Sequence, residues 1–328
     1  MLRDILRGKD AQIKAVVQVI AHVAPDVILL NGFDYDLNSA ALGAFRDQLA
    51  AAGQSYPHLF ALRPNTGLQS GLDLDGDGRI GGARDAIGYG RFSGEGGMAV
   101  LSRFPFTGEP RDLSALLWKD VPGHMIPPGF YTSQALDVLR LSTTGHWDLS
   151  VLVGDRPVRL LSYYASPPVF DGPEDRNGRR NHDETQLWQL YLDGKLGPAP
   201  DAPFVILGDA NLDPNDGDGR GAAMRALLAR PDIQDPRPKS RGGAAAAKSE
   251  AGPNLTHMGD PALDTANWSE TEGPGNLRVD YVLPSADLRV LDAGVFWPLP
   301  GTPEAEVLAV KDTEASRHRL VWVDLSFR

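Results

Sequence analysis

The acidic segment Asp73–Ile80 has a spacing of side chains that suits a metal ion. Its aspartates alternate with other residues, and Gly78 stands at the sixth position. This order matches the first half of an EF-hand calcium loop, where alternate side chains and one backbone carbonyl contribute oxygen ligands. The twelfth position is Arg84 instead of glutamate, so a complete helix–loop–helix unit is not expected. The predicted Ca²⁺ ligands are Asp73, Asp75, Asp77, Arg79 (through its backbone carbonyl) and Asp85. The alternative is a solvated acidic turn.

A second polar group follows an apolar strand. The run Phe204–Leu207 leads into Gly208 and then into Asp209–Ala210–Asn211. Because side chains alternate along a strand, Asp209 and Asn211 are expected on one face, where both can reach the same ligand. The same two residues are also typical of a turn at the end of a strand. The residues alone leave both interpretations open.

The composition limits the classes of partner. Lys and Arg total 32 against 43 Asp and Glu, which gives a formal net charge of −11. Non-specific nucleic-acid binding needs a basic surface, so a nucleic-acid partner is not expected. A small phosphorylated substrate remains compatible, because a bound cation can reverse the local field. The chain has no cysteine. That excludes a disulfide, a thiolate zinc site and a thiol nucleophile.

Alternating helices and strands must position these side chains. Apolar residues between Ile13 and Val23 recur at helical spacing, and the apolar strand Val27–Leu30 follows them. The pattern repeats with a helix over Asp183–Leu192 before Phe204–Leu207. Further strands are predicted at Met98–Leu101, Val158–Tyr163, Val279–Leu283 and Leu320–Phe327. Polar stretches at 64–97, 166–182, 212–220 and 236–276 are predicted as loops, with a mobile loop at Gly242–Lys248. We expect one mixed α/β domain over residues 1–328.

Four landmarks spread over most of the chain carry a resemblance to a known family. They are, in order, Asn31–Asp34 after an apolar strand, Gly97–Pro105, Gly208–Asn211, and Arg278–Val282 followed by Ser316–Arg319. Their order resembles the endonuclease/exonuclease/phosphatase superfamily, and the segments Trp118–Asp120 and Ser166–Glu184 resemble a bacterial subgroup of it. The resemblance implies a DNase I-like four-layer α/β sandwich. In that fold two mixed β-sheets pack face to face with helices outside.

The resemblance also implies a chemistry, which is phosphoester hydrolysis with a divalent cation, typically Mg²⁺. Asp209 matches the aspartate that positions or deprotonates water, and Asn211 matches the asparagine that holds the phosphate. His318 matches the histidine that stabilises developing charge. In such a site a further aspartate orients the histidine. These three residues are the predicted catalytic positions.

Three positions depart from the family pattern. Gly32 stands where the family has a metal-binding glutamate, Arg317 replaces the aspartate before the terminal histidine, and Tyr164 stands where the subgroup has a histidine. An arginine at 317 would repel a metal and cannot accept an imidazole N–H. The family also begins with a strand that carries an asparagine near the metal, and we expect no such strand before the first helix here. The sequence therefore argues against Mg²⁺ in the cleft, while Tyr164, Arg317 and Arg319 remain candidates to bind a phosphate.

Two functions stay open from the sequence. The first is a catalytically impaired relative of metal-dependent phosphoester hydrolases, a pseudoenzyme that binds a protein partner or a phosphorylated or acidic small ligand. The second is an active Mg²⁺- or Ca²⁺-dependent phosphomonoesterase or phosphodiesterase, with a nuclease the weaker form of it. The first thirty residues lack a signal-peptide pattern, and no apolar run reaches the ~20 residues of a membrane helix. We expect a soluble protein, and relatives in the family suggest the periplasm or the cell exterior.

Overall fold

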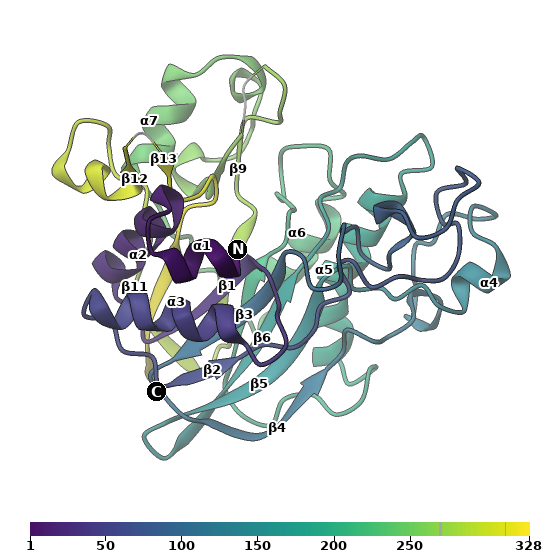
Figure 1. Cartoon of the computed structure of the whole chain (residues 1–328), viewed down its shortest axis with the longest axis horizontal. Helices are drawn as coiled ribbons and strands as arrows, with labels where there is room; N and C mark the ends of the chain where they lie inside the picture. The colour runs from purple at the N-terminus through teal and green to yellow at the C-terminus, as the bar shows by residue number, and fades with distance from the viewer. Residues whose placement is uncertain (269–270, 312) are drawn as a thin grey trace.

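Two β-layers face each other, with helices on their outer sides (Figure 1). The computed structural model describes residues 1–268, 271–311 and 313–328. The larger sheet has the order β10-β7-β6-β5-β4. Its strands are β4 (Phe106–Asp112), β5 (Gly145–Val153), β6 (Arg156–Tyr164), β7 (Phe204–Asp209) and β10 (Asp280–Pro284). This sheet is mixed, because β6 and β7 are parallel while the other neighbours are antiparallel.

The second layer consists of two separate antiparallel pieces. One has the order β1-β3-β2, and the other pairs β11 with β14. Their strands are β1 (Val27–Phe33), β2 (His58–Phe60), β3 (Gly97–Ser102), β11 (Leu288–Val295) and β14 (Val321–Phe327). Among the described residues, β1 has a partner only on the β3 side and β14 only on the β11 side. Within the described residues, β1 and β14 are therefore each unpaired along one edge, as are β2 and β11.

Helices cover the outer face of each layer, on opposite sides of the molecule in Figure 1. On the side of β1 and β3 lie α1 (Leu2–Arg7), α2 (Ala11–Val23) and α3 (Ala40–Ala51). Ile20 of α2 and Phe45 of α3 share a buried cluster with Leu101 of β3. On the larger sheet lie α5 (Arg176–Leu192) and α6 (Ala222–Leu228), where Leu187 packs with Ile206. This arrangement confirms the four-layer α/β sandwich predicted from the sequence.

The remaining elements are short and lie mostly in the connections. They are α4 (Ser133–Leu136), α7 (Arg241–Ser249), β8 (Ala266–Asn267), β9 (Asn276–Leu277), β12 (Ala309–Val310), β13 (Thr313–Glu314) and the 3₁₀ turns Ala83–Asp85, Trp118–Asp120, Gly252–Leu255, Pro261–Leu263 and Pro303–Leu308. No helix in the described part of the chain is long and apolar enough to cross a membrane.

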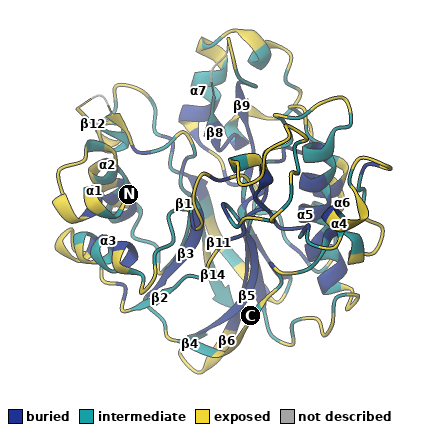
Figure 2. Cartoon of the chain, turned by 45° about the vertical axis from the view of Figure 1, so that its right-hand side comes forward, coloured by how far each residue is buried: buried dark blue, intermediate teal, exposed yellow. Residues whose placement is uncertain are grey.

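The apolar patterns predicted the central elements. The predicted helix ending at Val23 is α2, and the predicted strands at 27–30, 98–101 and 204–207 are β1, β3 and β7. The interior of the sandwich is formed by strand residues on the facing sides of the two layers, such as Val100 and Leu149. Figure 2 shows these strands among the most buried parts of the molecule. The period of the hydrophobic residues and the length of the apolar runs were sufficient to predict these elements.

Two predicted loops are helical instead. The prediction of a mobile loop at Gly242–Lys248 is wrong, because these residues lie in α7. Alanine has the highest helix propensity, and the Ser240 hydroxyl caps the helix by accepting the Gly243 amide N–H at 3.0 Å. The polar stretch 166–182 also includes the first turns of α5, which starts at Arg176. Its polar side chains are buried against loop backbone, so they carry no amphipathic pattern.

Candidate functional site

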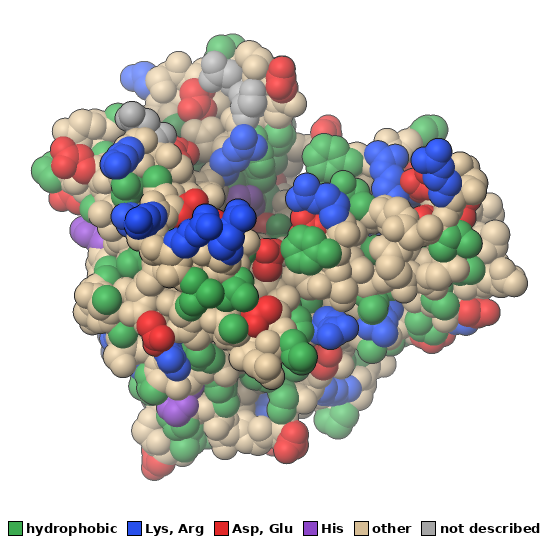
Figure 3. All heavy atoms as spheres, in the orientation of Figure 1, with side chains coloured by type: hydrophobic (Ala, Val, Ile, Leu, Met, Phe, Trp, Pro, Cys, Tyr) green, Lys and Arg blue, Asp and Glu red, His purple; other side chains and the backbone are tan. Residues whose placement is uncertain are grey.

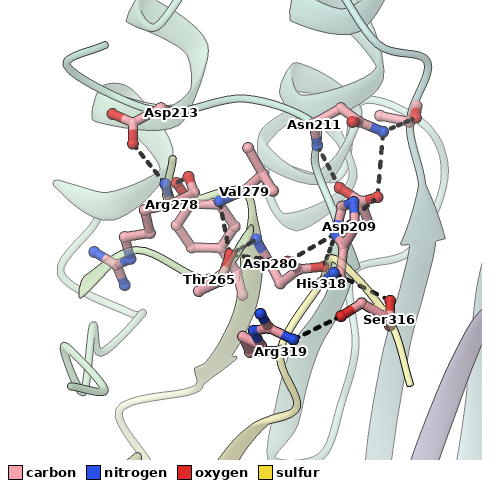
Figure 4. A network of polar contacts seen from close by, with 12 residues as sticks. Asp209, Asn211, Asp213, Thr265, Arg278, Val279, Asp280, Ser316, His318 and Arg319 are labelled. Atoms are coloured by element: carbon pink, nitrogen blue, oxygen red, sulfur yellow. Dashed lines mark hydrogen bonds and ion pairs between the residues drawn. The ribbon is translucent and has the colours of Figure 1, made fainter. Parts of the chain in front are cut away.

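Two carboxylates meet because of the pairing of β7 with β10. Asp209 is the last residue of β7 and Asp280 the first of β10, and the antiparallel register places them directly opposite each other. His318 comes from the segment before β14. Its Nδ1 lies 3.0 Å and 3.1 Å from the two oxygens of Asp280, and 3.7 Å from Oδ2 of Asp209. Figure 4 shows these three side chains converging. We call them the triad.

Asp280 is the residue that orients His318, and it was not among the predicted catalytic positions. The sequence marked Arg278–Val282 as a landmark without assigning a role to its aspartate. The structure also changes the importance of position 317, because the imidazole N–H is donated to Asp280 and needs no acceptor there. Arg317 itself is exposed, and its backbone carbonyl accepts the Asn267 amide N–H.

Further contacts hold Asp280 in place. The Thr265 hydroxyl donates to Asp280 at 2.8 Å, and the same oxygen accepts the amide N–H groups of Val279 and Asp280 at 3.0 Å. Trp268 stands edge-on to the imidazole of His318, with ring centroids 5.2 Å apart. The carboxylate, the hydroxyl and the indole together fix the ring plane of His318.

The electrostatics of the triad favour a protonated histidine. Burial alone would lower the pKa of His318, but the carboxylates of Asp280 and Asp209 raise it to about 10. Burial raises the pKa of Asp209, because an ionised carboxylate is poorly solvated there; the charge of His318 acts in the opposite direction. At neutral pH the site therefore presents an imidazolium between two carboxyl groups.

Asn211 contacts Asp209 through a turn and not through strand alternation. β7 ends at Asp209, and Asn211 has a φ of +47°. Its amide N–H donates to Oδ1 of Asp209 at 2.7 Å, and its side-chain Nδ2 donates to the Ala165 carbonyl at 2.9 Å. The turn interpretation therefore describes the observed geometry, and a shared ligand of Asp209 and Asn211 stays a prediction.

Gly32 stands where the family has its metal-binding glutamate, and Asp34 and Asp36 are the nearest carboxylates in the sequence. Gly32 has a φ of +73°, and a Cβ placed on it would have no atom within 4 Å. Asp34 accepts the Gly96 amide N–H at 3.0 Å and lies 3.8 Å from the terminal ammonium of Met1. Asp36 accepts two backbone N–H groups at the start of α3, at 2.7 Å and 2.8 Å.

The two remaining residues predicted to contact a phosphate, Tyr164 and Arg319, have different surroundings. Tyr164 ends β6 opposite Asp209 in the parallel register and lines the same groove as the triad; burial raises the pKa of its hydroxyl. Arg319 is buried, and its guanidinium donates to the Ser316 carbonyl at 2.8 Å. It also lies over the ring of Trp297, 4.9 Å from the centroid. Arg319 therefore anchors the segment that carries His318.

The molecular surface in this region is hollowed. In the view of Figure 3, acidic and histidine side chains are visible in a hollow bordered by Lys and Arg. The triad, Gly32 and Tyr164 line one groove with a volume of about 1330 Å³, which continues between the two β-layers. A ligand at the triad would thus contact an apolar groove on one side and solvent on the other.

The structure brings together part of the predicted calcium loop. Asp73, Asp75 and Asp85 each offer an oxygen within 4.8 Å of the others. Asp73 also accepts the amide N–H groups of Gly76 and Gly78 at 2.7 Å and 2.9 Å. Asp77 is outside this cluster and accepts the Arg79 amide N–H at 2.8 Å. The side chain of Asp85, one residue beyond the twelfth position, is the one that closes the loop.

Comparison with known proteins agrees with this architecture. The model of the Endonuclease/Exonuclease/phosphatase family matches residues 5–318. An endonuclease/exonuclease/phosphatase from Beutenbergia cavernae superposes with a TM-score of 0.57 at 19% identity, over 96% of this chain and 66% of that one. Family proteins from Bacteroides thetaiotaomicron (TM-score 0.53, 13% identity, 99% and 93% of the chains) and Leptotrichia buccalis (0.51, 14%, 96% and 93%) are also similar. No curated protein matches the sequence.

This chain spans 66% of the length of the Beutenbergia chain, which is therefore the longer of the two. The three structures are less than 20% identical to this chain, so their similarity establishes the fold alone. The chemistry at the triad has to be argued from the side chains themselves.

Proposed function

Because this chain belongs to the endonuclease/exonuclease/phosphatase family, we propose that its triad binds phosphoester ligands and hydrolyses them poorly. The observation that carries the proposal is the combination of an assembled Asp209–Asp280–His318 group with a glycine at position 32. The first retains the groups that contact a phosphate. The second removes a carboxylate from the position where the family holds its metal.

The retained side chains suit a phosphate group. A protonated His318 donates a charge-assisted hydrogen bond to a phosphate oxygen. The carboxylates of Asp209 and Asp280 are the triad groups that could ligate a divalent cation, because a protonated imidazole has no free lone pair for a metal. Asn211 is bound to Asp209 and to the backbone, which keeps the carboxylate in a single orientation.

Poor hydrolysis follows from the lack of a side chain at Gly32. Members of a concerted site act as a unit, and removing one commonly lowers the rate by orders of magnitude. Asp34 and Asp36, the nearest aspartates in the sequence, accept backbone N–H groups that hold them at the loop before β3 and at the start of α3. The expected behaviour is ligand binding with turnover close to the uncatalysed rate.

The test uses a chromogenic phosphomonoester and a chromogenic phosphodiester with Mg²⁺, Mn²⁺ or Ca²⁺. A non-hydrolysable phosphonate should bind in calorimetry, and Asp209→Ala or His318→Ala should weaken it at least tenfold. Asp155→Ala, an exposed carboxylate in the turn between β5 and β6 and outside the groove, is the matched control and should leave binding unchanged. Metal-dependent turnover that disappears in Asp209→Ala would overturn poor hydrolysis.

An active phosphoester hydrolase is the second candidate, and the Asp280–His318 contact favours it. An oriented histidine is a group that catalysis needs and that simple binding does not. The same assay separates the two functions, since only an active enzyme would show turnover that depends on both Asp280 and His318.

We also propose that the 73–85 loop holds a Ca²⁺ ion. The proposal is supported by three carboxylates whose oxygens lie within 4.8 Å of one another, in a sequence with half of the EF-hand spacing. Asp85 is buried while Asp73 and Asp75 are exposed, so an ion would lie at the surface with one anchored ligand. This ion would stabilise the loop and is separate from the triad.

A further inference from the structure

One buried carboxylate in the described part of the chain has no hydrogen-bond partner. Seven acidic side chains are buried there, and six of them accept hydrogen bonds from the protein: Asp85, Asp148, Asp183, Glu184, Asp209 and Asp213. Asp264 is the seventh, and it is only 7% exposed. Its carboxylate accepts no hydrogen bond from the residues that the structure describes. A buried carboxylate is costly unless it is paired, so Asp264 needs a partner from outside the chain.

The charged groups around Asp264 are all negative. Burial and the neighbouring charges of Asp213, Asp216 and Asp260 raise the pKa of Asp264 to about 8. No lysine or arginine of the described chain opposes them. Lys239 pairs with Asp260 at 2.7 Å and leaves Asp264 without a counter-charge. The position therefore combines burial, negative neighbours and an unused set of oxygen ligands.

Asp213 is the neighbour best placed to share a ligand with Asp264, because its charge has the largest effect there. Its Oδ1 accepts the amide N–H groups of Asn215 and Asp216 at 2.7 Å and 3.0 Å, and its Oδ2 accepts that of Arg278 at 2.8 Å. Burial raises the pKa of Asp213, and these N–H groups act in the opposite direction by stabilising the ionised form. A carboxylate oxygen has two lone pairs, so Oδ2 keeps one for a further partner.

The segments that carry the two carboxylates are tied together. Asp216, in the loop that follows Asp213, accepts the amide N–H groups of Met258 and Gly259 at 2.8 Å each. Met258 and Gly259 lead into the turn that ends at Asp264. The loop and the turn therefore hold their positions through backbone contacts, without a hydrogen bond to the Asp264 carboxylate itself.

We propose that Asp264 and Asp213 together hold one hydrated Mg²⁺ ion. The two side chains offer oxygen ligands, and Mg²⁺ is typically bound by one or two carboxylates while it keeps several waters. A divalent cation would neutralise both carboxylates, whereas a proton shared between them would leave one negative charge buried. The site is separate from the triad and from the 73–85 loop.

The ion would brace the segments that position Asp280. Asp213 binds the amide N–H of Arg278, two residues before Asp280. Thr265 follows Asp264 and donates its hydroxyl to Asp280 at 2.8 Å. Figure 4 shows both connections, with Asp213 joined to Arg278 and Thr265 beside Asp280. Loss of the ion should therefore loosen these segments while every triad side chain stays in the chain.

The test adds Mg²⁺ to the whole chain carrying Asp75→Ala, which removes the 73–85 cluster as a second binding site. Saturating Mg²⁺ should raise the melting temperature by about 3–6 °C. It should also slow the amide exchange of Asn215 and Asp216 at least tenfold, because Asp213 binds both N–H groups. Asp264→Asn removes the charge without breaking a hydrogen bond of the described chain, and it should abolish both effects. Asp218→Asn, at an exposed position of the same loop, is the matched control and should retain both.

Two results would overturn the proposal. Equal Mg²⁺ effects in Asp264→Asn and Asp218→Asn would place the ion elsewhere. Unchanged exchange of Asn215 and Asp216 on adding Mg²⁺ to the chain with Asp264 intact would assign Asp264 to a buried proton, and this measurement stands even if Asp264→Asn does not fold. None of these readouts involves a phosphoester, so the Mg²⁺ site and the proposed function fail independently.

Discussion

His318 is charged because two carboxylates reach it from different strands. Asp209 ends β7 and Asp280 begins β10, and both side chains lie within 4 Å of the imidazole Nδ1. The interaction stabilises the folded protein only while the imidazole carries a proton. Its folded pKa of about 10 is above the ordinary 6.5, so the contribution is complete below pH ~6.5 and is lost as the pH rises through about 10.

Asp280→Asn tests which carboxylate dominates. Removing a charge in direct contact should lower the pKa of His318 by about 1–3 units, because opposite charges within this range shift a pKa by that amount. The imidazole pKa can be followed by NMR titration. Asp324→Asn, at an exposed position of β14, should leave the pKa unchanged. A pKa that is the same in Asp280→Asn and the parent would assign the charge to Asp209 instead.

Gly32→Ala tests the backbone at the lost glutamate position. There is open space for the added methyl, but the φ of +73° is unfavourable for a residue with a Cβ. We expect a loss of about 1 kcal/mol in the free energy of unfolding, measured with urea. Gly43 is the control, because it also has open space but lies inside α3, where alanine should stabilise by about 0.5–1 kcal/mol. Equal effects at both positions would show that φ is not the cause. A glutamate at position 32 would carry the same backbone cost.

At the scale of elements, the sequence predicted those helices and strands whose buried residues recur with a single period. β1, β7 and α2 are apolar on one or both faces, and their patterns predicted them. The start of α5 gave no such signal, because its buried face is polar: Asn181, Asp183 and Glu184 are all buried. The sequence also could not predict that Asp209 lies opposite Asp280, since this depends on which distant strands pair.

Glu184 shows what the polar face of α5 does. Its carboxylate accepts the amide N–H and hydroxyl of Thr143 at 2.6 Å and 2.7 Å, and those of Ser166 at 2.8 Å and 2.9 Å. Thr143 precedes β5 and Ser166 follows β6, so one side chain fixes the ends of two strands near the site. Glu184→Ala should cost at least about 2 kcal/mol in urea unfolding, because four buried donors lose their acceptor. Glu174→Ala, nearer the surface, should cost less than about 0.5 kcal/mol. Similar losses in both variants would contradict this role.

The calcium loop is also tested as an element. Ca²⁺ should raise the melting temperature of the parent protein, and Asp75→Ala should remove that gain because a ligand is lost. Asp77→Ala is the discriminating control: its carboxylate is outside the cluster and should leave most of the gain. The EF-hand spacing suggested Asp77 as an equal ligand, so the two variants separate the spacing argument from the geometry. A parent protein with no gain from Ca²⁺ would exclude the site.

At the scale of the whole molecule, the open second layer sets this chain apart from a closed sandwich. The apolar patterns predicted β1 and β14 as strands, but they could not show that the two stay apart with a groove between them. That outcome depends on long-range packing, since the helices α1–α3 hold β1 while β14 is held by β11. The triad lies on the same groove, so the open layer and the site are physically continuous.

An apolar groove of this kind should bind hydrophobic dyes in the native state. We expect anilinonaphthalene sulfonate to fluoresce with the folded protein, because half-buried Leu29 and Leu325 face the groove. Val323→Asp, which places a charge on the groove wall, should reduce the signal several-fold without changing the far-ultraviolet circular dichroism. Met258→Asp is the matched control, since Met258 is 88% exposed and outside the groove. If Met258→Asp lowers the fluorescence as much as Val323→Asp, the dye binds elsewhere and the groove is closed in solution.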